Sequence, residues 1–287
     1  MTGPASAVTG AAWVNGPRLP GPIATAREVW HYRRFLRYLG YRAMRKLYAR
    51  TALGWIWIVI RPLFPILVRV LVFGGLLGLT SEGVPYFLFL TVGTVSWNLF
   101  ASGLMWSTRG LELNRRVVTQ VYVPKAILPI ATTAPAVFDF LVNMAVLVLA
   151  VVFYRVKDGT TYLSLGLHTL WSLAAIVLTM LLVLGIGFFT SVWGERARDA
   201  RFTAGHLLTI GFLVTPVLYS VSSVPAAYRS WLYANPMAAF VQAFKYGLLG
   251  RERPDPLHFA IAAAVTLTVL VSGLFFFASR EEAEAEA

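Results

Sequence analysis

Six apolar runs, each of roughly 20 residues or more, constrain the fold of this chain more than any other feature. A helix that rises about 1.5 Å per residue needs about 20 apolar residues to cross roughly 30 Å of hydrocarbon. The runs cover residues 51–79, 85–108, 126–154, 165–193, 202–221 and 257–278. With 57% hydrophobic and 13% charged residues, the composition disfavours a soluble domain. We therefore expect an all-α integral membrane protein with six transmembrane helices.

The placement of basic residues predicts the orientation of these spans. Of the 25 Lys and Arg residues, 17 lie in the N-terminal segment, the 109–125 loop, the 194–201 loop and the C-terminal tail, against 6 in the connections on the other side. Lys and Arg accumulate in cytoplasmic loops. We therefore expect a multi-pass protein of the bacterial cytoplasmic membrane with both termini cytoplasmic. The net charge of +12 is then explained by basic residues that set the membrane topology and contact membrane lipids. No nucleic-acid partner is expected.

Two further segments precede the first apolar run. Residues 1–24 are rich in Gly, Pro and Ala, which predicts a disordered cytoplasmic tail. Residues 25–50 open with the capping-box spacing of Thr25 and Glu28 and alternate apolar with basic positions at the helical period. They predict an amphipathic interfacial helix whose apolar side lies in the acyl boundary. The expected headgroup contacts are Arg34, Arg37, Tyr38, Tyr41 and Arg45.

The connection 222–256 is too apolar for a solvated loop and too interrupted for a span. It predicts a re-entrant helical pair in the external loop before the last span. Pro225 and Pro236 each suit a first helical position, Asn235 suits an N-cap and Gly250 suits a helix stop. The six-span domain would thus cover 51–279, followed by an acidic cytoplasmic tail at 280–287.

Four sequence motifs, in order, resemble the ABC-2 type permeases, especially those of polysaccharide, O-antigen, galactan and teichoic-acid exporters. Leu53-Gly54-Trp55-Ile56-Trp57 with Arg61-Pro62-Leu63 is similar to the family's first span. Residues 92–100 (VGTVSWNLF) resemble its second span, and residues 114–129 resemble its cytoplasmic coupling segment. Residues 224–237 resemble its external loop. The resemblance covers about residues 25–280.

The resemblance implies a homodimer with two copies of a separate nucleotide-binding ATPase subunit, which would hold ATP and Mg and move a lipid-linked glycan. A Walker A loop requires a Gly-Lys pair, and each of the four lysines here follows a residue other than glycine. No cofactor and no ATP hydrolysis are therefore expected in this chain. The coupling segment 109–125 would meet the ATPase, or alternatively lie on anionic lipid, through Leu113, Asn114, Arg115, Val117, Val118, Gln120, Tyr122 and Pro124.

An aromatic face of the second span suggests a sugar path. Two copies would enclose a channel between spans one, two and five, where aromatic rings stack on sugar rings. The channel residues would be Trp57, Phe89, Trp97, Phe100 and Tyr219. The alternative for the second-span rings is ordinary packing together with an outer aromatic belt.

Two charges lie deep inside predicted spans. Arg69 and Asp139 either pair with each other or contact an anionic lipid diphosphate. Glu195 and Asp199, interleaved with arginines, predict a solvated network or a second ATPase contact.

The remaining residues favour neither metal binding nor catalysis. The four histidines lack ligand spacing, the chain has no cysteine, and no paired carboxylates or nucleophilic triad appear. Three other functions stay open: a permease for drugs or small lipids, a polytopic enzyme that processes lipid-linked glycans, and a scaffold without transport.

Overall fold

The computed structural model describes residues 27, 30–48, 56–79, 81, 83–118, 125–197 and 199–285, and every regular element among them is helical. The prediction of an all-α fold is confirmed. The elements are α2 (Arg33–Tyr48), α3 (Ile56–Arg69), the π-helix η1 (Val70–Leu76), α4 (Tyr86–Thr108), α5 (Gly110–Val118), α6 (Ile127–Ala131), α7 (Ala134–Asp158), α8 (Thr169–Arg196), α9 (Asp199–Val214), the 3-10 turn η2 (Val221–Ser223), α10 (Ala226–Leu232), α11 (Pro236–Leu249) and α12 (Pro256–Ala285).

Among the described residues, four helical stretches are long and apolar enough to cross a membrane. They are Tyr86–Thr108, Ile127–Asp158, Thr169–Glu195 and Pro256–Arg280, and they correspond to four of the six predicted spans. The first predicted span forms α3 and η1, in which the shorter stretch Leu63–Leu76 is the apolar part. The fifth forms α9, whose 16 residues extend about 24 Å at the usual helical rise.

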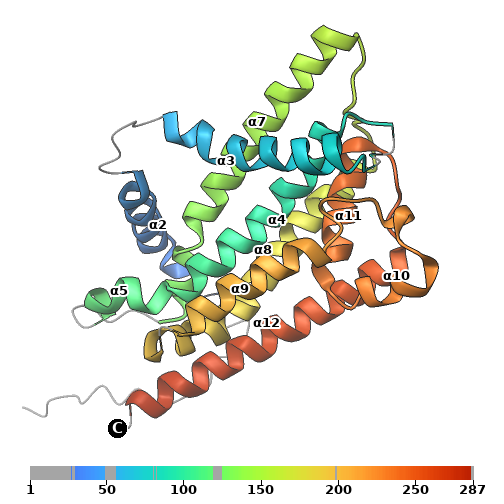
Figure 1. Ribbon diagram of the computed structural model, residues 1–287. Helices are drawn as coiled ribbons and strands as arrows, with labels where there is room; N and C mark the ends of the chain where they lie inside the picture. The colour runs from blue at the N-terminus through green and yellow to red at the C-terminus, as the bar shows by residue number, and fades with distance from the viewer. Residues whose placement is uncertain are drawn as a thin grey trace, which may run out of the picture.

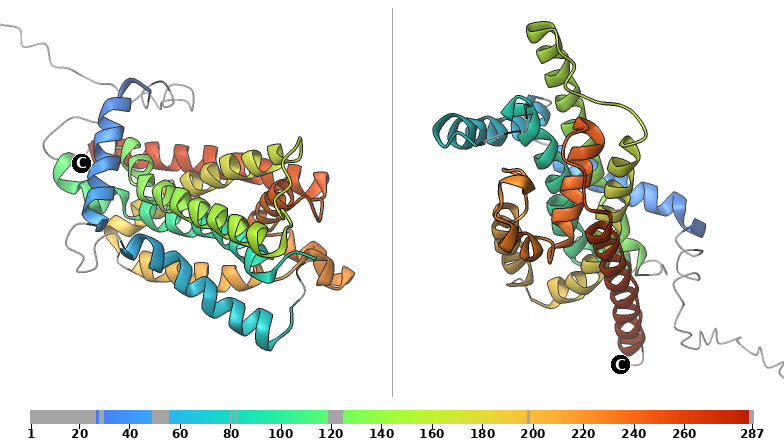
Figure 2. Two further views of the ribbon diagram at one scale, coloured as in Figure 1. Left: turned by 90° about the horizontal axis from the view of Figure 1, so that it is seen from above. Right: turned by 90° about the vertical axis from the view of Figure 1, so that its right-hand side faces the viewer.

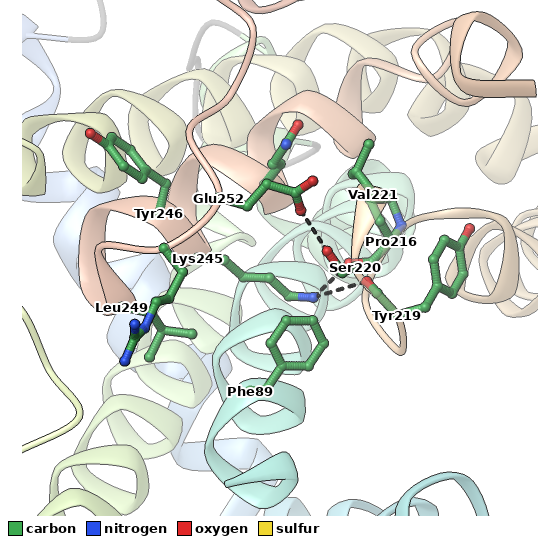
Figure 3. A pocket seen from close by; sticks show the side chains of 11 residues that line it. Phe89, Pro216, Tyr219, Ser220, Val221, Lys245, Tyr246, Leu249 and Glu252 are labelled. Carbon is green, nitrogen blue, oxygen red and sulfur yellow. Dashed lines mark hydrogen bonds between the residues drawn. The ribbon is translucent and has the colours of Figure 1, made fainter. Parts of the chain in front are cut away.

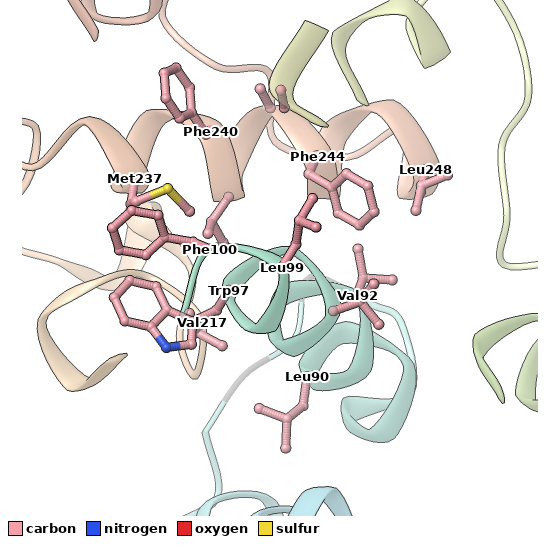
Figure 4. Packing of buried hydrophobic residues seen from close by; sticks show 14 of the residues in the cluster. Leu90, Val92, Trp97, Leu99, Phe100, Val217, Met237, Phe240, Phe244 and Leu248 are labelled. Atoms are coloured by element: carbon pink, nitrogen blue, oxygen red, sulfur yellow. The ribbon is translucent and has the colours of Figure 1, made fainter. Parts of the chain in front are cut away.

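The core of the bundle is built around α4 and α8. Helix α8 packs against α12, α4 and α11, and α4 packs against α7 on its other side. Most side chains of α4 are buried, which agrees with an apolar character all around this helix. Figure 4 shows Leu99 of α4 close to Phe244 of α11, and Phe100 of α4 close to Met237.

Glycines allow these helices to approach closely. A Cβ atom on Gly185 of α8 would lie 2.8 Å from the main chain of α12 at Leu270, and one on Gly247 of α11 would lie 2.6 Å from the main-chain nitrogen of Ser172. Small residues at such crossings are typical of membrane helices, because they permit extensive van der Waals contact between backbones.

The bundle has two distinct ends (Figures 1 and 2). Helix α2 crosses one end, where α5, the turn between α8 and α9, and the last turns of α12 also lie; we call this the α2–α5 end. The opposite end, here the α10 end, carries η2, α10 and the start of α12. Helix α2 and the last turns of α12 therefore share one end of the bundle.

Part of the apolar face of α2 is covered by protein. Leu39 is buried and, with Leu36, belongs to a cluster that includes Leu128 and Phe188. A Cβ atom on Gly40 would lie 2.8 Å from the Cβ of Ala134, so α2 presses directly on the start of α7. Leu39 therefore contacts protein, whereas Leu36 is half-buried, and the interfacial position of α2 stays a prediction. Tyr38, Tyr41 and the arginines 34, 37 and 45 are exposed, as expected, whereas the 1–24 tail and the capping-box residues lie outside the described residues.

The predicted helical pair before the last span is present as α10 and α11. The Asn235 side chain accepts a hydrogen bond of 3.0 Å from the Met237 amide, and Pro236 is the first residue of α11. Gly250 ends α11 with a φ of +66°, a left-handed conformation that favours glycine. Pro225 is the N-cap of α10, whereas we predicted it to be the first helical residue, so the helix begins one residue later than expected.

Candidate functional site

Helix α9 is only partly enclosed, and its buried residues are Ala204 and Phe212. It packs against α4 and α8, while Phe202, Leu207, Ile210 and Leu213 expose a continuous apolar side. It lies on the same side of the bundle as α3 and η1 (Figure 2). Since side-to-side packing covers only part of α9, the contacts at its two ends are important for its position.

At the α2–α5 end, charged side chains join α9 and α8 to α5. The Arg201 guanidinium of α9 lies 2.8 Å and 3.1 Å from the two carboxylate oxygens of Glu112 on α5. Arg115 of α5 and Glu195 of α8 are 4.0 Å apart in a more exposed contact. The predicted solvated charge network is thus, in part, a set of links between α5 and the turn that joins α8 to α9.

Helix α5 is also fixed at its base. Leu111 and Asn114 are buried, and the Asn114 amide donates a hydrogen bond of 2.9 Å to the Gly110 carbonyl. A Cβ atom on Gly110 would lie 2.7 Å from the Cα of Pro129, so α5 begins in close contact with α6. The outward side of α5 carries Arg115, which is 78% exposed. Helix α5 is therefore packed on α6 at its start and exposed on its other side.

Several predicted coupling residues fall where the structure gives no side-chain description. Val117 and Val118 are in α5, but their side chains are not described, and Gln120, Tyr122 and Pro124 lie outside the described residues. Leu113 is half-buried. The docking role of the segment stays a prediction.

A cation and three aromatic rings connect the end of α3 with α9 and α4. The Arg69 guanidinium lies 4.2 Å from the centroid of the Phe212 ring, a cation–π contact. Phe212 packs edge-on against Trp97 at 6.1 Å, and Trp97 packs against Phe100 at 5.5 Å. Asp139 of α7 is half-buried and its main-chain carbonyl accepts from Asn143. The pairing of Arg69 with Asp139 stays a prediction.

The rings predicted to line a channel are mostly core residues. Phe89, Trp97 and Phe100 are 1%, 5% and 8% exposed, and all three belong to the main hydrophobic cluster. This burial favours the packing alternative for the second span. Tyr219 is half-buried and its hydroxyl donates to the Val214 carbonyl at 2.7 Å. The Trp57 side chain is not described, so its channel role is still only predicted.

At the α10 end, a buried lysine holds the segment that follows α9. Lys245 of α11 is 8% exposed, and its ammonium group donates to the carbonyls of Pro216 and Val217 at 2.7 Å and 3.0 Å. The same group lies 3.6 Å from the centroid of the Phe89 ring. Figure 3 shows the lysine reaching from α11 toward the 216–219 segment, with Phe89 of α4 beside its ammonium.

A small, partly open pocket lies beside Lys245. Its polar lining includes Gln242, Arg251 and Glu252, whose carboxylate accepts a hydrogen bond of 2.7 Å from Ser220. Tyr233 donates to Gln242 at 2.6 Å and stacks on His258 of α12. Asp255 caps the start of α12. The hydrogen bond from the Leu257 amide, and to a smaller extent the one with His258, lowers the pKa of the Asp255 carboxyl group. Polar and ring contacts therefore tie the connection between α9 and α11 to α11, to the turn that follows it and to the start of α12.

Sequence reasoning missed both Lys245 and the Glu112–Arg201 contact. The count of basic residues by side places Lys245 among the loop charges, although it stands inside the apolar stretch from Met237 to Leu249, where a lysine needs a buried partner. Glu112 and Arg201 are 89 positions apart, so periodicity alone cannot bring them together.

Comparison with known proteins identifies the family to which the chain is similar. The sequence profile described as ABC-2 type transporter matches residues 34–249. The O-antigen export system permease protein RfbA of Myxococcus xanthus is 24% identical over 266 residues, which cover 92% of this chain and 99% of that protein. The polysialic acid transport protein KpsM of Escherichia coli is 26% identical over 84% of this chain and 92% of its own length. RfbA of Klebsiella pneumoniae is 22% identical over 79% and 85%.

Replacing Trp97 by Ala will distinguish core packing from a sugar path. Loss of a large buried ring costs about 3–5 kcal/mol, so we expect a clear drop in the amount and thermal stability of the membrane protein. Trp231→Ala, at a side chain that is 79% exposed, is the matched control and will leave both unchanged. Normal stability of Trp97→Ala together with impaired polysaccharide export would support the sugar path instead.

Proposed function

Because the chain belongs to the ABC-2 type transporter family, we propose that it is the membrane-spanning permease subunit of an ATP-driven polysaccharide exporter. The observation that carries this proposal is the match along almost the full length of an O-antigen export permease. A second similarity, to a polysialic acid transport protein, extends over most of both chains. The common feature in the names of these relatives is the movement of a polysaccharide.

In this proposal the chain supplies the path and a separate subunit supplies the energy. Two copies of the chain face each other across α3, η1 and α9, whose exposed apolar side chains include Phe64, Leu71 and Ile210. Each copy binds one nucleotide-binding ATPase subunit, which holds ATP and Mg. The substrate is a lipid-linked glycan, so that a membrane anchor accompanies the sugar chain during export.

The membrane arrangement follows from the same proposal. The α2–α5 end faces the cytoplasm, since basic residues gather there, and α10 and α11 form the re-entrant pair on the outer side. Besides the four long apolar helices, α3–η1 and α9 complete six spans, with α9 shielded by the second copy. Residues with a broken helical backbone, such as 215–220, are tolerated at membrane depth when protein surrounds them.

Movement of the ATPase reaches the channel through α5 in this scheme. The exposed side of α5 receives the partner, and the Glu112–Arg201 contact transfers the displacement to α9. Because α9 lines the proposed dimer contact, a small shift at its base changes the spacing between the two copies.

Depletion of the chain in its own cells tests the proposed function. We expect a lipid-linked polysaccharide to accumulate on the cytoplasmic side while the same polymer disappears from the cell surface, because synthesis continues without export. Lipid extraction and glycan analysis of depleted and complemented cells measure both pools. An unchanged surface polymer with no internal accumulation would contradict the function.

Charge reversal tests the transfer through α5 and α9. Glu112→Arg and Arg201→Glu each place like charges together, so we expect strongly reduced export, whereas the double reversal restores the attraction and the export. Exposed ion pairs contribute only about 0–1 kcal/mol, so thermal stability should change little in any variant. Arg155→Glu, at an exposed arginine in the last turn of α7, serves as control and should leave export unchanged. Normal export in both single variants would exclude this route.

A further inference from the structure

The chain that follows α9 carries carbonyl groups without helical partners. After Val214 the helix ends, and the last carbonyls of a helix require other hydrogen-bond donors. Side chains provide them from three elements. The Tyr219 hydroxyl donates to the Val214 carbonyl at 2.7 Å, Tyr86 of α4 to Leu218 at 2.8 Å, and Lys245 of α11 to Pro216, Val217 and Tyr219 at 2.7, 3.0 and 3.5 Å. The position of this segment therefore depends on side-chain donors rather than on regular backbone pairing.

The group around the Lys245 ammonium has the composition of a cation site. Carbonyl oxygens approach it from the 216–219 segment, and the face of the Phe89 ring lies 3.6 Å away on α4. Charge-assisted hydrogen bonds and an aromatic face both stabilise a cation, and they do so most where water is excluded. In this site the cation is the ammonium group of Lys245, a residue of α11.

The space for this lysine is created by a glycine on α4. A Cβ atom on Gly93 would lie 2.7 Å from the Lys245 Cε and 2.9 Å from the Val217 carbonyl oxygen. Three elements, α4, α11 and the end of α9, thus meet at one point, and a side chain on α4 would separate them. The site is built into the packing of the protomer.

We propose that Lys245 is a positioning residue for export, whose ammonium group fixes the α10 end of α9 to the rigid pair α4 and α11. Helix α11 is almost completely buried, whereas α9 exposes a long apolar side, so the lysine connects an enclosed element to a less enclosed one. The anchoring follows from the contacts of this structure. Its importance for export rests on the proposed function.

The absence of cysteine in the chain permits a direct test of the anchor. Leu218→Cys places a thiol at a position that is 3% exposed, so a maleimide reagent should label it slowly while the anchor is intact. The assay uses the full-length protein in lipid nanodiscs. Lys245→Ala removes the ammonium, leaves carbonyls without a donor and should accelerate labelling by at least about tenfold through local opening.

Chemical rescue separates the role of the charge from that of the side-chain volume. Lys245→Ala removes three carbon atoms and the ammonium group, and propylammonium has the same atoms. Addition of this ion should therefore restore slow labelling and, in cells, polysaccharide export. Lys245→Met fills the space without a charge, so it should label rapidly and should not respond to the ion. Protection of the introduced thiol in both variants would overturn the anchor, and rapid labelling with undiminished export would overturn its role in export.

A second variant keeps the test valid if Lys245→Ala does not fold. Gly93→Ala retains the lysine but displaces its stem, so the thiol of Leu218→Cys should be labelled faster than in the chain with Gly93 intact. Gly205→Ala on α9, where a Cβ atom would meet nothing within 4 Å, is the control and should leave labelling unchanged. Equal protection in Gly93→Ala and Gly205→Ala would contradict the proposal. Labelling does not depend on any polymer, so failure of the proposed function would appear separately, as absent export by the parent chain.

Discussion

The Lys245 ammonium is the contact on which the α10 end of the molecule depends. It satisfies carbonyls of a broken helix in an apolar surrounding, where each unpaired polar group is costly. The same contact joins α4, α11 and the end of α9. A charged side chain is thereby used to hold a helix that hydrophobic packing encloses only in part.

The opposite end of α9 is held differently. The Glu112–Arg201 pair lies at the α2–α5 end and is more exposed, and exposed pairs contribute little to stability. In the exporter that we propose, this contact links α5 to α9 and can break and reform at low energetic cost. In the proposed exporter, α9 would have a firm attachment at its outer end and an adjustable one at the cytoplasmic end.

The sequence predicts the elements of this fold better than their contacts. Hydropathy alone places α4, α7, α8 and α12, and the local signals at Asn235 and Gly250 correctly bound α11. The aromatic side of α4 is a weaker guide, because the same periodicity describes a channel wall and a buried face, and Trp97 is buried. The Leu39 side of α2 is ambiguous for a similar reason, since hydropathy cannot tell lipid from protein. Lys245 and Glu112 act through partners distant in sequence, which no local pattern reveals.

The central claim is that α9 moves relative to the rest of the protomer when the ATPase partner binds ATP. Spin labels at Leu207→Cys on α9 and Leu173→Cys on α8, both exposed positions in a cysteine-free chain, allow their separation to be measured by pulsed electron paramagnetic resonance. In the complex, the account predicts different distance distributions with and without ATP, and a single unchanged distribution after Glu112→Ala. Identical distributions in both nucleotide states of an export-competent complex would contradict it.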